Sequence, residues 1–161
     1  RPDTFLRKMA GVPLGVAADA VDTAISILEG KADRMTGQAY RDTPRVQLAV
    51  ATAQARLAAA RAYVFESLEA QWARLQGGEP MTTRERANVW LSRTHAFQTA
   101  REVVSSLYDT IGAGAIYSER GPFDRHMRDI QTACQHIVAQ TKTWEDVGLM
   151  LLGGTPNSPM I

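Results

Sequence analysis

The feature that most constrains the fold of this chain is one long amphipathic stretch, residues 43–78. Its apolar residues recur every three or four positions, the period of an α-helix: Val46, Val50, Ala53, Leu57, Ala60, Val64 and Leu68. The stretch opens at Pro44 and stops at Gly77-Gly78. It predicts a helix of about 34 residues, roughly 50 Å long at 1.5 Å per residue. Its alanine-rich middle would let a neighbouring helix approach closely.

Four further stretches have the same helical period. They are residues 13–34, residues 82–110, residues 122–141 and a short segment at 143–154. The second of them opens with the Thr-x-x-Glu pattern of a capping box. No segment shows the alternation of a β-strand. Long helices joined by short polar loops predict an all-α, antiparallel four-helix bundle with a short fifth C-terminal helix, as a single domain over residues 1–161.

Composition excludes several classes of partner and compartment. The chain has 161 residues and a net charge of +1, which gives no electrostatic case for nucleic acid or an anionic membrane. The single cysteine, Cys134, falls on a predicted apolar face and cannot form an internal disulfide, which suits a reducing cytoplasm. No run of about 18 apolar residues and no basic-then-apolar leader is present. We therefore expect a cytoplasmic protein.

Metal chemistry is not expected from this sequence. A di-metal carboxylate bundle needs Glu-x-x-His on two helices, and this motif does not occur. The three histidines form no i, i+4 pair that could bind zinc. No phosphate-binding loop and no nucleophile motif is found either.

The stretch "GPFDRHMRDIQTACQHI", residues 121–137, places two kinds of side chain on opposite sides of one helix. The expected apolar side holds Phe123, Met127, Ile130, Cys134 and Ile137. The expected polar side holds Arg125, Asp129, Thr132 and His136. Periodicity alone leaves two interpretations of the polar line open: a solvated face, or a face aimed at a ligand.

The same residues carry a family resemblance. "FDRHMRDIQTACQHI" resembles a signature of Arg-x-x-Arg-Asp followed by a histidine seven residues after the aspartate. This signature belongs to the C-terminal helical domain of the acyl-CoA dehydrogenase superfamily. It is closest to the type 2 branch, which contains two-component flavin-dependent monooxygenases. The order of the segments "PLGVAADAVD", "DTPRVQLAVATAQARLAAARAYVFE", "IGAGAIY" and "VGLMLLGG" agrees with that domain over about residues 12–156.

The resemblance implies a role for the signature residues. Members of the family are longer, with an N-terminal helical domain and a middle β-domain, so this chain resembles their C-terminal domain alone. The position of His136 matches a histidine beside the reactive edge of the flavin. There an imidazole can hydrogen-bond a peroxide or take a proton from a phenol. Arg125, Arg128 and Asp129 match the Arg-x-x-Arg-Asp part, which orients the helix and its neighbours.

The resemblance also implies how the flavin, FAD or FMN, is held. Gly112 and Gly114 match a glycine turn that lets backbone approach a flavin, often that of a neighbouring subunit. Arg34 lies near the position of an arginine that binds the flavin pyrophosphate, although "RMTG" departs from the usual Arg-x-x-Phe-Gly. The family further implies a homodimer or homotetramer as the assembly.

Three functions remain open at this point. A monooxygenase would use reduced flavin and O2, with a flavin reductase as a partner. An acyl-CoA dehydrogenase needs a carboxylate base, yet after Asp129 the next acid is Glu145, and the segment before the first helix offers only Asp3. The missing base favours the monooxygenase. The third function is a non-catalytic oligomerisation module.

Overall fold

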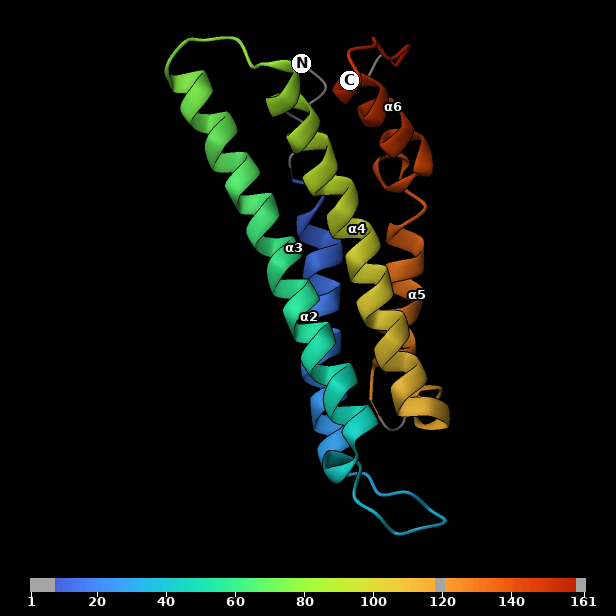
Figure 1. Cartoon of the computed structure of the whole chain (residues 1–161). Coiled ribbons are helices and arrows are strands. Elements are labelled where there is room, and N and C mark those ends of the chain that lie inside the picture. Colours follow the sequence, from blue (N-terminus) through green and yellow to red (C-terminus); the bar gives the residue numbers. More distant parts are fainter. Residues whose placement is uncertain (1–7, 118–120, 159–161) are drawn as a thin grey trace.

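The computed structural model describes residues 8–117 and 121–158, and these fold into a bundle of five α-helices (Figure 1). They are α2 (Gly11–Glu29), α3 (Pro44–Gln76), α4 (Thr83–Ile111), α5 (Phe123–Ala133) and α6 (Thr141–Leu151). The described residues form no strand and only one isolated bridge, between Ala32 and Ala39. The prediction of an all-α bundle is confirmed. Asp3, the acid that precedes the first predicted helix, lies outside the described residues.

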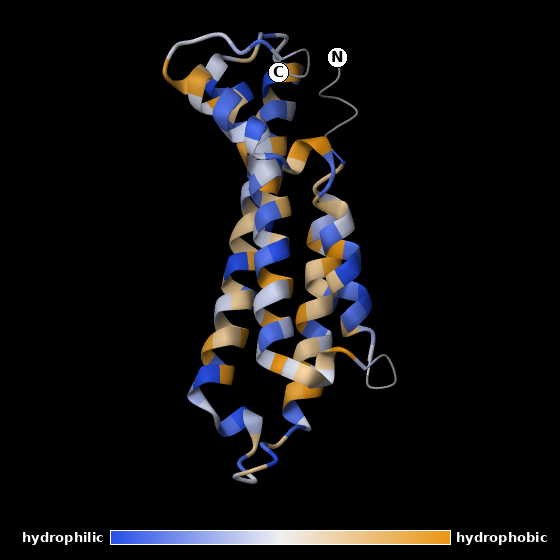
Figure 2. Ribbon diagram, turned by 90° about the vertical axis from the view of Figure 1, so that its right-hand side faces the viewer, coloured by the Kyte–Doolittle hydropathy of each residue, from blue (hydrophilic) through white to orange (hydrophobic). Residues whose placement is uncertain are grey.

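Helix α4 is the centre of the bundle, because it packs against each of the other four helices. Fifteen of its residues are buried, among them Phe97, Val103, Val104, Leu107 and Ile111. Helix α3 packs along it and α2 lies behind both (Figure 1). Hydrophobic and hydrophilic residues alternate around each helix at the helical period (Figure 2). The pattern therefore buries one stripe of each helix against α4.

The fourth position of the bundle is shared by two short helices. α5 and α6 follow one another along α4, with a turn between them (Figure 1). The prediction of one helix over residues 122–141 is therefore wrong at its C-terminal end, because α5 stops at Ala133. The predicted fifth helix is present, and it begins at Thr141 rather than at residue 143.

Helix α2 ends earlier than its sequence pattern predicts. It stops at Glu29, with Gly30 as its C-cap, and residues 31–43 form a turn closed by the Ala32–Ala39 bridge. By length and composition alone, α2 with its 19 residues could span a membrane, with a mean hydropathy of 1.4 over an 18-residue window. Ala17, Ala20 and Ala24 are nevertheless completely buried against the other helices. Burial in the bundle core accounts for the apolar composition of this helix.

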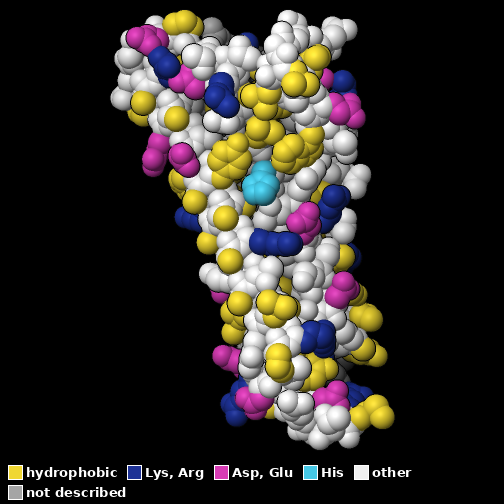
Figure 3. Space-filling model, viewed as in Figure 1, with side chains coloured by type: hydrophobic (Ala, Val, Ile, Leu, Met, Phe, Trp, Pro, Cys, Tyr) yellow, Lys and Arg dark blue, Asp and Glu magenta, His cyan; other side chains and the backbone are white. Residues whose placement is uncertain are grey.

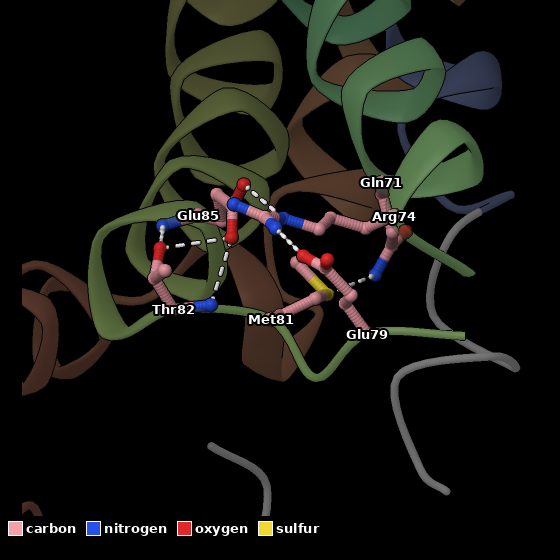
Figure 4. Close-up of polar contacts among 6 residues, drawn as sticks. All are labelled: Gln71, Arg74, Glu79, Met81, Thr82 and Glu85. Carbon is pink, nitrogen blue, oxygen red and sulfur yellow. Dashed lines mark hydrogen bonds and ion pairs between the residues drawn. The ribbon is translucent and has the colours of Figure 1, made fainter. Parts of the chain in front are cut away.

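The turn between α3 and α4 is held by a network around Glu85 (Figure 4). One Glu85 carboxylate oxygen accepts the backbone N–H of Thr82 at 2.7 Å, and the Thr82 hydroxyl oxygen accepts the backbone N–H of Glu85 at 3.2 Å. This is the predicted capping box. The Nε of Arg74 donates to the second Glu85 oxygen at 2.7 Å, and Arg74 also pairs with Glu79. The Thr82 backbone N–H, followed by Arg74, lowers the pKa of Glu85 to about 2.

A histidine to which the sequence analysis gave no role joins α2 to α5. His126 is only 2% exposed, and its Nε2 lies 3.4 Å from a carboxylate oxygen of Asp19 and 3.3 Å from the hydroxyl of Thr23. Its ring meets that of Phe123 edge to face, with centroids 5.8 Å apart. A buried imidazole needs such polar partners, since leaving it unpaired costs free energy. His126 therefore fixes where α5 sits on α2.

The first prediction concerns the pH dependence of unfolding. The pKa of Glu85 is about 2 in the folded chain, below the 4.5 of an ordinary glutamate. Its carboxylate therefore stabilises the fold at neutral pH, and this stabilisation is lost as pH falls from about 4.5 towards 2. We expect the thermal midpoint of Glu85→Gln to lie below that of the wild type at pH 7, with the gap closing near pH 2. Thermal unfolding followed by circular dichroism measures both midpoints. The exposed Glu69→Gln on α3 is the control, and an equal pH dependence of the two variants would contradict the prediction.

The second prediction concerns the α2–α5 contact. His126→Ala removes a buried ring and leaves the Asp19 and Thr23 side chains without that partner, so unfolding should become easier by about 2–4 kcal/mol. Arg125→Ala, one residue earlier on the exposed side of α5, should change it by at most about 0.5 kcal/mol. Urea denaturation compares the two. Equal losses of stability would mean that the buried histidine does not hold the helices together.

Candidate functional site

His136 does not lie on α5, where the sequence pattern placed it. The helix ends at Ala133, and the backbone at His136 is extended, with φ −64° and ψ 144°. His136 is instead the N-cap of a short 3-10 turn, Ile137–Ala139, and its ring nitrogen Nδ1 accepts the backbone N–H of Val138 at 3.3 Å. A side chain that binds nearby backbone competes with helix formation, which explains the early end of α5.

Contacts with α4 also favour the break between α5 and the turn. The Thr94 hydroxyl lies 2.9 Å from the carbonyl oxygen of Val138 and donates to it or to the Trp90 carbonyl at 3.1 Å. The Cys134 thiol donates to the carbonyl of Phe97 at 3.4 Å. Cys134 is buried, as predicted, and burial raises the pKa of its thiol. These tertiary contacts override the local helical period.

The polar line expected on one helix face is therefore divided. Arg125, Asp129 and Thr132 remain on the exposed side of α5, and His136 lies beyond its end. Ile137, expected on the apolar side, is 54% exposed because it also lies beyond the helix. The structure does not bring the signature residues of α5 and His136 onto one face.

The charged residues of the signature pair within α5. Nε of Arg125 lies 3.7 Å from a carboxylate oxygen of Asp129, and Arg128 donates to Asp124 at 3.0 Å. Both are i, i+4 pairs, and both arginines are exposed. Exposed pairs of this kind contribute little free energy.

The surroundings of His136 are partly apolar. Its ring stacks on that of the buried Phe97, with centroids 6.4 Å apart and planes inclined by 16°. A hollow lined by Trp90, Val138 and Asp146 among others includes the two residues that follow His136 but not His136 itself. Asp146 is buried, and Lys142 donates to it at 2.8 Å, which raises the pKa of Lys142. The sequence analysis missed this acid, and its only signal was an i, i+4 Lys–Asp spacing.

The glycine turn lies at the far end of α4. Gly112 is the C-cap of that helix and has φ +67°, a conformation that favours glycine. A Cβ at Gly114 would stand 3.5 Å from the Nζ of Lys31. That ammonium donates to the carbonyl of Ile111 and lies 4.7 Å from the ring centroid of Tyr40. Lys31 thus connects the glycine turn to the loop after α2.

The loop after α2 brings Arg34 to the same place. Its neighbour Asp33 accepts the backbone N–H groups of Met35 and Thr36 at 2.9 and 2.8 Å, which lowers the pKa of Asp33. Together with the glycine turn, this loop lines a hollow whose cations are Arg34, Lys31 and Arg45, with the acids Asp33 and Asp109. The structure therefore brings Arg34, Gly112 and Gly114 together. Sequence reasoning missed Lys31 and Arg45, because only tertiary contacts place them there.

The two candidate regions lie far apart along α4. His136 stacks on Phe97, and Gly112 follows Phe97 by fifteen residues, which is about 22 Å of helix at 1.5 Å per residue. One region is therefore an imidazole stacked on a buried phenylalanine, and the other is a cationic hollow beside a glycine turn. Within the described ranges, no group of three histidine, cysteine or carboxylate side chains could hold a metal ion.

Comparison with known proteins identifies the domain. A family model described as acyl-CoA dehydrogenase, C-terminal domain, matches residues 8–141. Indole-3-acetate monooxygenase of Pseudomonas putida is 34% identical over 145 residues, which cover 90% of this chain and 37% of that protein.

Two solved structures have the same fold. XiaF from Streptomyces sp., in complex with FADH2 and glycerol, superposes with a TM-score of 0.88 at 18% identity, covering 99% of this chain and 41% of that one. The 3-HSA hydroxylase from Rhodococcus sp. RHA1 gives a TM-score of 0.87 at 18% identity, covering 99% of this chain and 42% of that one. The chain thus spans about two fifths of the length of these relatives. It belongs to the acyl-CoA dehydrogenase C-terminal domain family, as its signature residues predict.

Proposed function

We propose that this chain is the C-terminal domain of a flavin-dependent monooxygenase, a hydroxylase that uses reduced flavin and O2. The observation that carries the proposal is the 34% identity to indole-3-acetate monooxygenase over 90% of the chain. The imidazole of His136, which accepts the Val138 N–H and stacks on the buried Phe97, supports it. The domain alone is not expected to be active, since it spans 37% of that relative.

The cofactor we propose is a flavin, and the hollow at the glycine turn fits its phosphates. Arg34, Lys31 and Arg45 line this hollow, and guanidinium and ammonium groups bind phosphate oxygens well. The side-chain-free Gly112 and Gly114 leave room for backbone to approach a ligand. When bound, a reduced flavin supplies the electrons for O2 activation. FADH2 is named in the complex of the similar XiaF, which favours FAD over FMN.

The spacing of the two regions supports an oligomer. About 22 Å of α4 separates His136 from the glycine turn, which is longer than the ribityl chain between a flavin ring and its phosphate. One chain would therefore place its histidine beside one flavin and its cationic hollow beside another. A homodimer or homotetramer, in which each flavin lies between two copies, satisfies this geometry.

The outer face of α3 is suited to meeting a second copy of this chain. Much of its exposed side opposite the core is small or apolar, with Glu66 and Glu69 as the acids near its C-terminal end: the small and apolar residues are Leu48, Ala51, Ala55, Ala58, Ala62, Phe65 and Trp72. Hydrophobic side chains lie scattered between charged ones along the face of the molecule formed by α3 and α4 (Figure 3). Alanine on a helix surface allows close approach of another helix.

The alternative of an acyl-CoA dehydrogenase lacks a suitable base in the described residues. Glu145 is on the exposed side of α6. Asp146 is buried beside the hollow, and its carboxylate already accepts a hydrogen bond from Lys142 at 2.8 Å. Proton abstraction next to a thioester requires a carboxylate within reach of the carbon acid, and the Asp146 carboxylate is instead buried and paired with Lys142 of its own helix. We also propose that the protein acts in the cytoplasm and that a separate flavin reductase is its partner.

The proposal predicts that His136 matters for chemistry and little for folding. In His136→Asn, the asparagine is still a favoured N-cap residue that can accept the Val138 N–H. Its shorter side chain has no polar group at the position of Nε2. We expect hydroxylation by the full-length protein to fall by about 10²–10⁴-fold, as for the loss of a catalytic hydrogen-bonding or acid–base group, while reduced flavin still binds. Single-turnover oxygenation with pre-reduced flavin measures the rate. Gln135→Asn, at the preceding exposed position, is the control, and unchanged turnover in His136→Asn would contradict the proposal.

A second prediction concerns assembly. Sedimentation at tens of micromolar should give dimers or tetramers of this chain. Ala62→Glu puts a charge on the outer face of α3 without disturbing the core, so it should shift the chain towards monomers. Ala18→Glu makes the same change on an exposed position of α2 and should leave assembly intact. A monomeric wild type would contradict the predicted oligomer, and equal effects of the two variants would contradict the role of the outer face of α3.

A further inference from the structure

The two nitrogens of the His136 ring have different surroundings. Nδ1 lies 3.3 Å from the backbone nitrogen of Val138, whose N–H donates to it. In the described ranges, no hydrogen bond is formed to Nε2. The ring plane is set by stacking on Phe97, at an inclination of 16°. Nδ1 therefore accepts a hydrogen bond from the chain's own backbone.

The Val138 N–H that faces Nδ1 cannot turn away. The Val138 side chain is only 1% exposed, in the core between the turn and α4. Its carbonyl oxygen lies 2.9 Å from the Thr94 hydroxyl. The turn itself is closed by the backbone N–H of Ala139, which donates to the carbonyl of His136 at 2.9 Å. The side chain, carbonyl and neighbouring peptide of Val138 thus all fix its N–H.

A fixed N–H determines which tautomer the ring adopts. A neutral imidazole carries one proton, on either nitrogen. The Val138 N–H needs a lone pair on Nδ1, so the proton is on Nε2. In the other tautomer, two N–H groups would point at each other, and both would lose a hydrogen bond. This assignment follows from the heavy-atom geometry and the rules of hydrogen bonding.

We propose that His136 acts as a hydrogen-bond donor through Nε2–H and not as a base, and that Val138 is the positioning residue that enforces this. The inference rests on the proposed function. It decides between the two roles that the family resemblance leaves open. A base needs a free lone pair, and here that of Nδ1 is taken by Val138 while Nε2 already holds the proton. The fitting partner is an oxygen atom that gains negative charge during oxygen transfer, because such an atom accepts a hydrogen bond. A phenolic substrate would lose its proton to another group.

Nitrogen NMR on protein labelled with 15N in histidine tests the tautomer directly. Spectra at about pH 8.5, where ordinary imidazoles are neutral, should show His136 with a protonated Nε2 and an unprotonated Nδ1. Loss of the signal in His136→Asn assigns it, and a denatured sample gives the mixture of tautomers of a free side chain. A proton on Nδ1, or the same mixture in the folded protein, would overturn the inference. This result does not depend on activity.

A second experiment uses the full-length protein and asks what Nε2 does. Glutamine places its side-chain amide N–H near the position of Nε2, and it cannot take up a proton at neutral pH. We expect His136→Gln to keep single-turnover oxygenation within about tenfold of the wild type, while His136→Ala loses about 10²–10³-fold, as for one missing oxyanion donor. A glutamine variant as slow as the alanine variant would overturn the donor role. An alanine variant as fast as the wild type would overturn the proposed function instead, with the tautomer still decided by NMR.

Discussion

The seam between α4 and the turn after α5 is the contact on which the arrangement of this domain depends. At this seam the Thr94 hydroxyl binds the carbonyl of Val138, and the Cys134 thiol binds the carbonyl of Phe97. Both donors and acceptors are buried, where an unpaired polar group would cost about 1–3 kcal/mol. The chain forms these contacts by leaving the helical path at Ala133. That departure puts α6 above α5 along α4 and turns the His136 ring onto Phe97.

The sequence predicts well those parts of the fold that local chemistry determines. The period of the long stretch predicts α3 to within two residues at each end, because Pro44 and Gly77 mark its limits. The capping box predicts the start of α4, because Thr82 and Glu85 bind each other's backbone within one turn. The end of α5 could not be predicted in the same way. Residues 134–137 continue the helical period, and the partners that break it are on α4, some forty residues earlier in the chain.

The candidate site likewise has residues that the sequence identifies and an arrangement that only tertiary contacts determine. A resemblance in order and spacing singled out His136, Arg34, Gly112 and Gly114. The spacing of residues in the sequence does not show which of them lie together. In the structure, Arg34 shares a hollow with the two glycines, and His136 does not. It also adds Lys31, whose ammonium binds the carbonyl of Ile111 at the end of α4. Side chains that meet through tertiary contacts leave no local pattern, and this is why sequence reasoning missed Lys31.

In the proposed site, the fold itself sets the tautomer of His136. The proton position on His136 is not set by a second charged side chain, as in many acid–base sites. It is set by a backbone N–H that the fold itself immobilises through a buried valine and a threonine hydroxyl. A backbone N–H can only donate, so with a neutral imidazole this hydrogen bond has one possible direction. A side-chain carboxylate on Nδ1 would demand the opposite tautomer and would leave Nε2 as a base. Whether His136 acts as a donor or as a base therefore depends on where α5 ends. The end of α5 depends in turn on the contacts with α4.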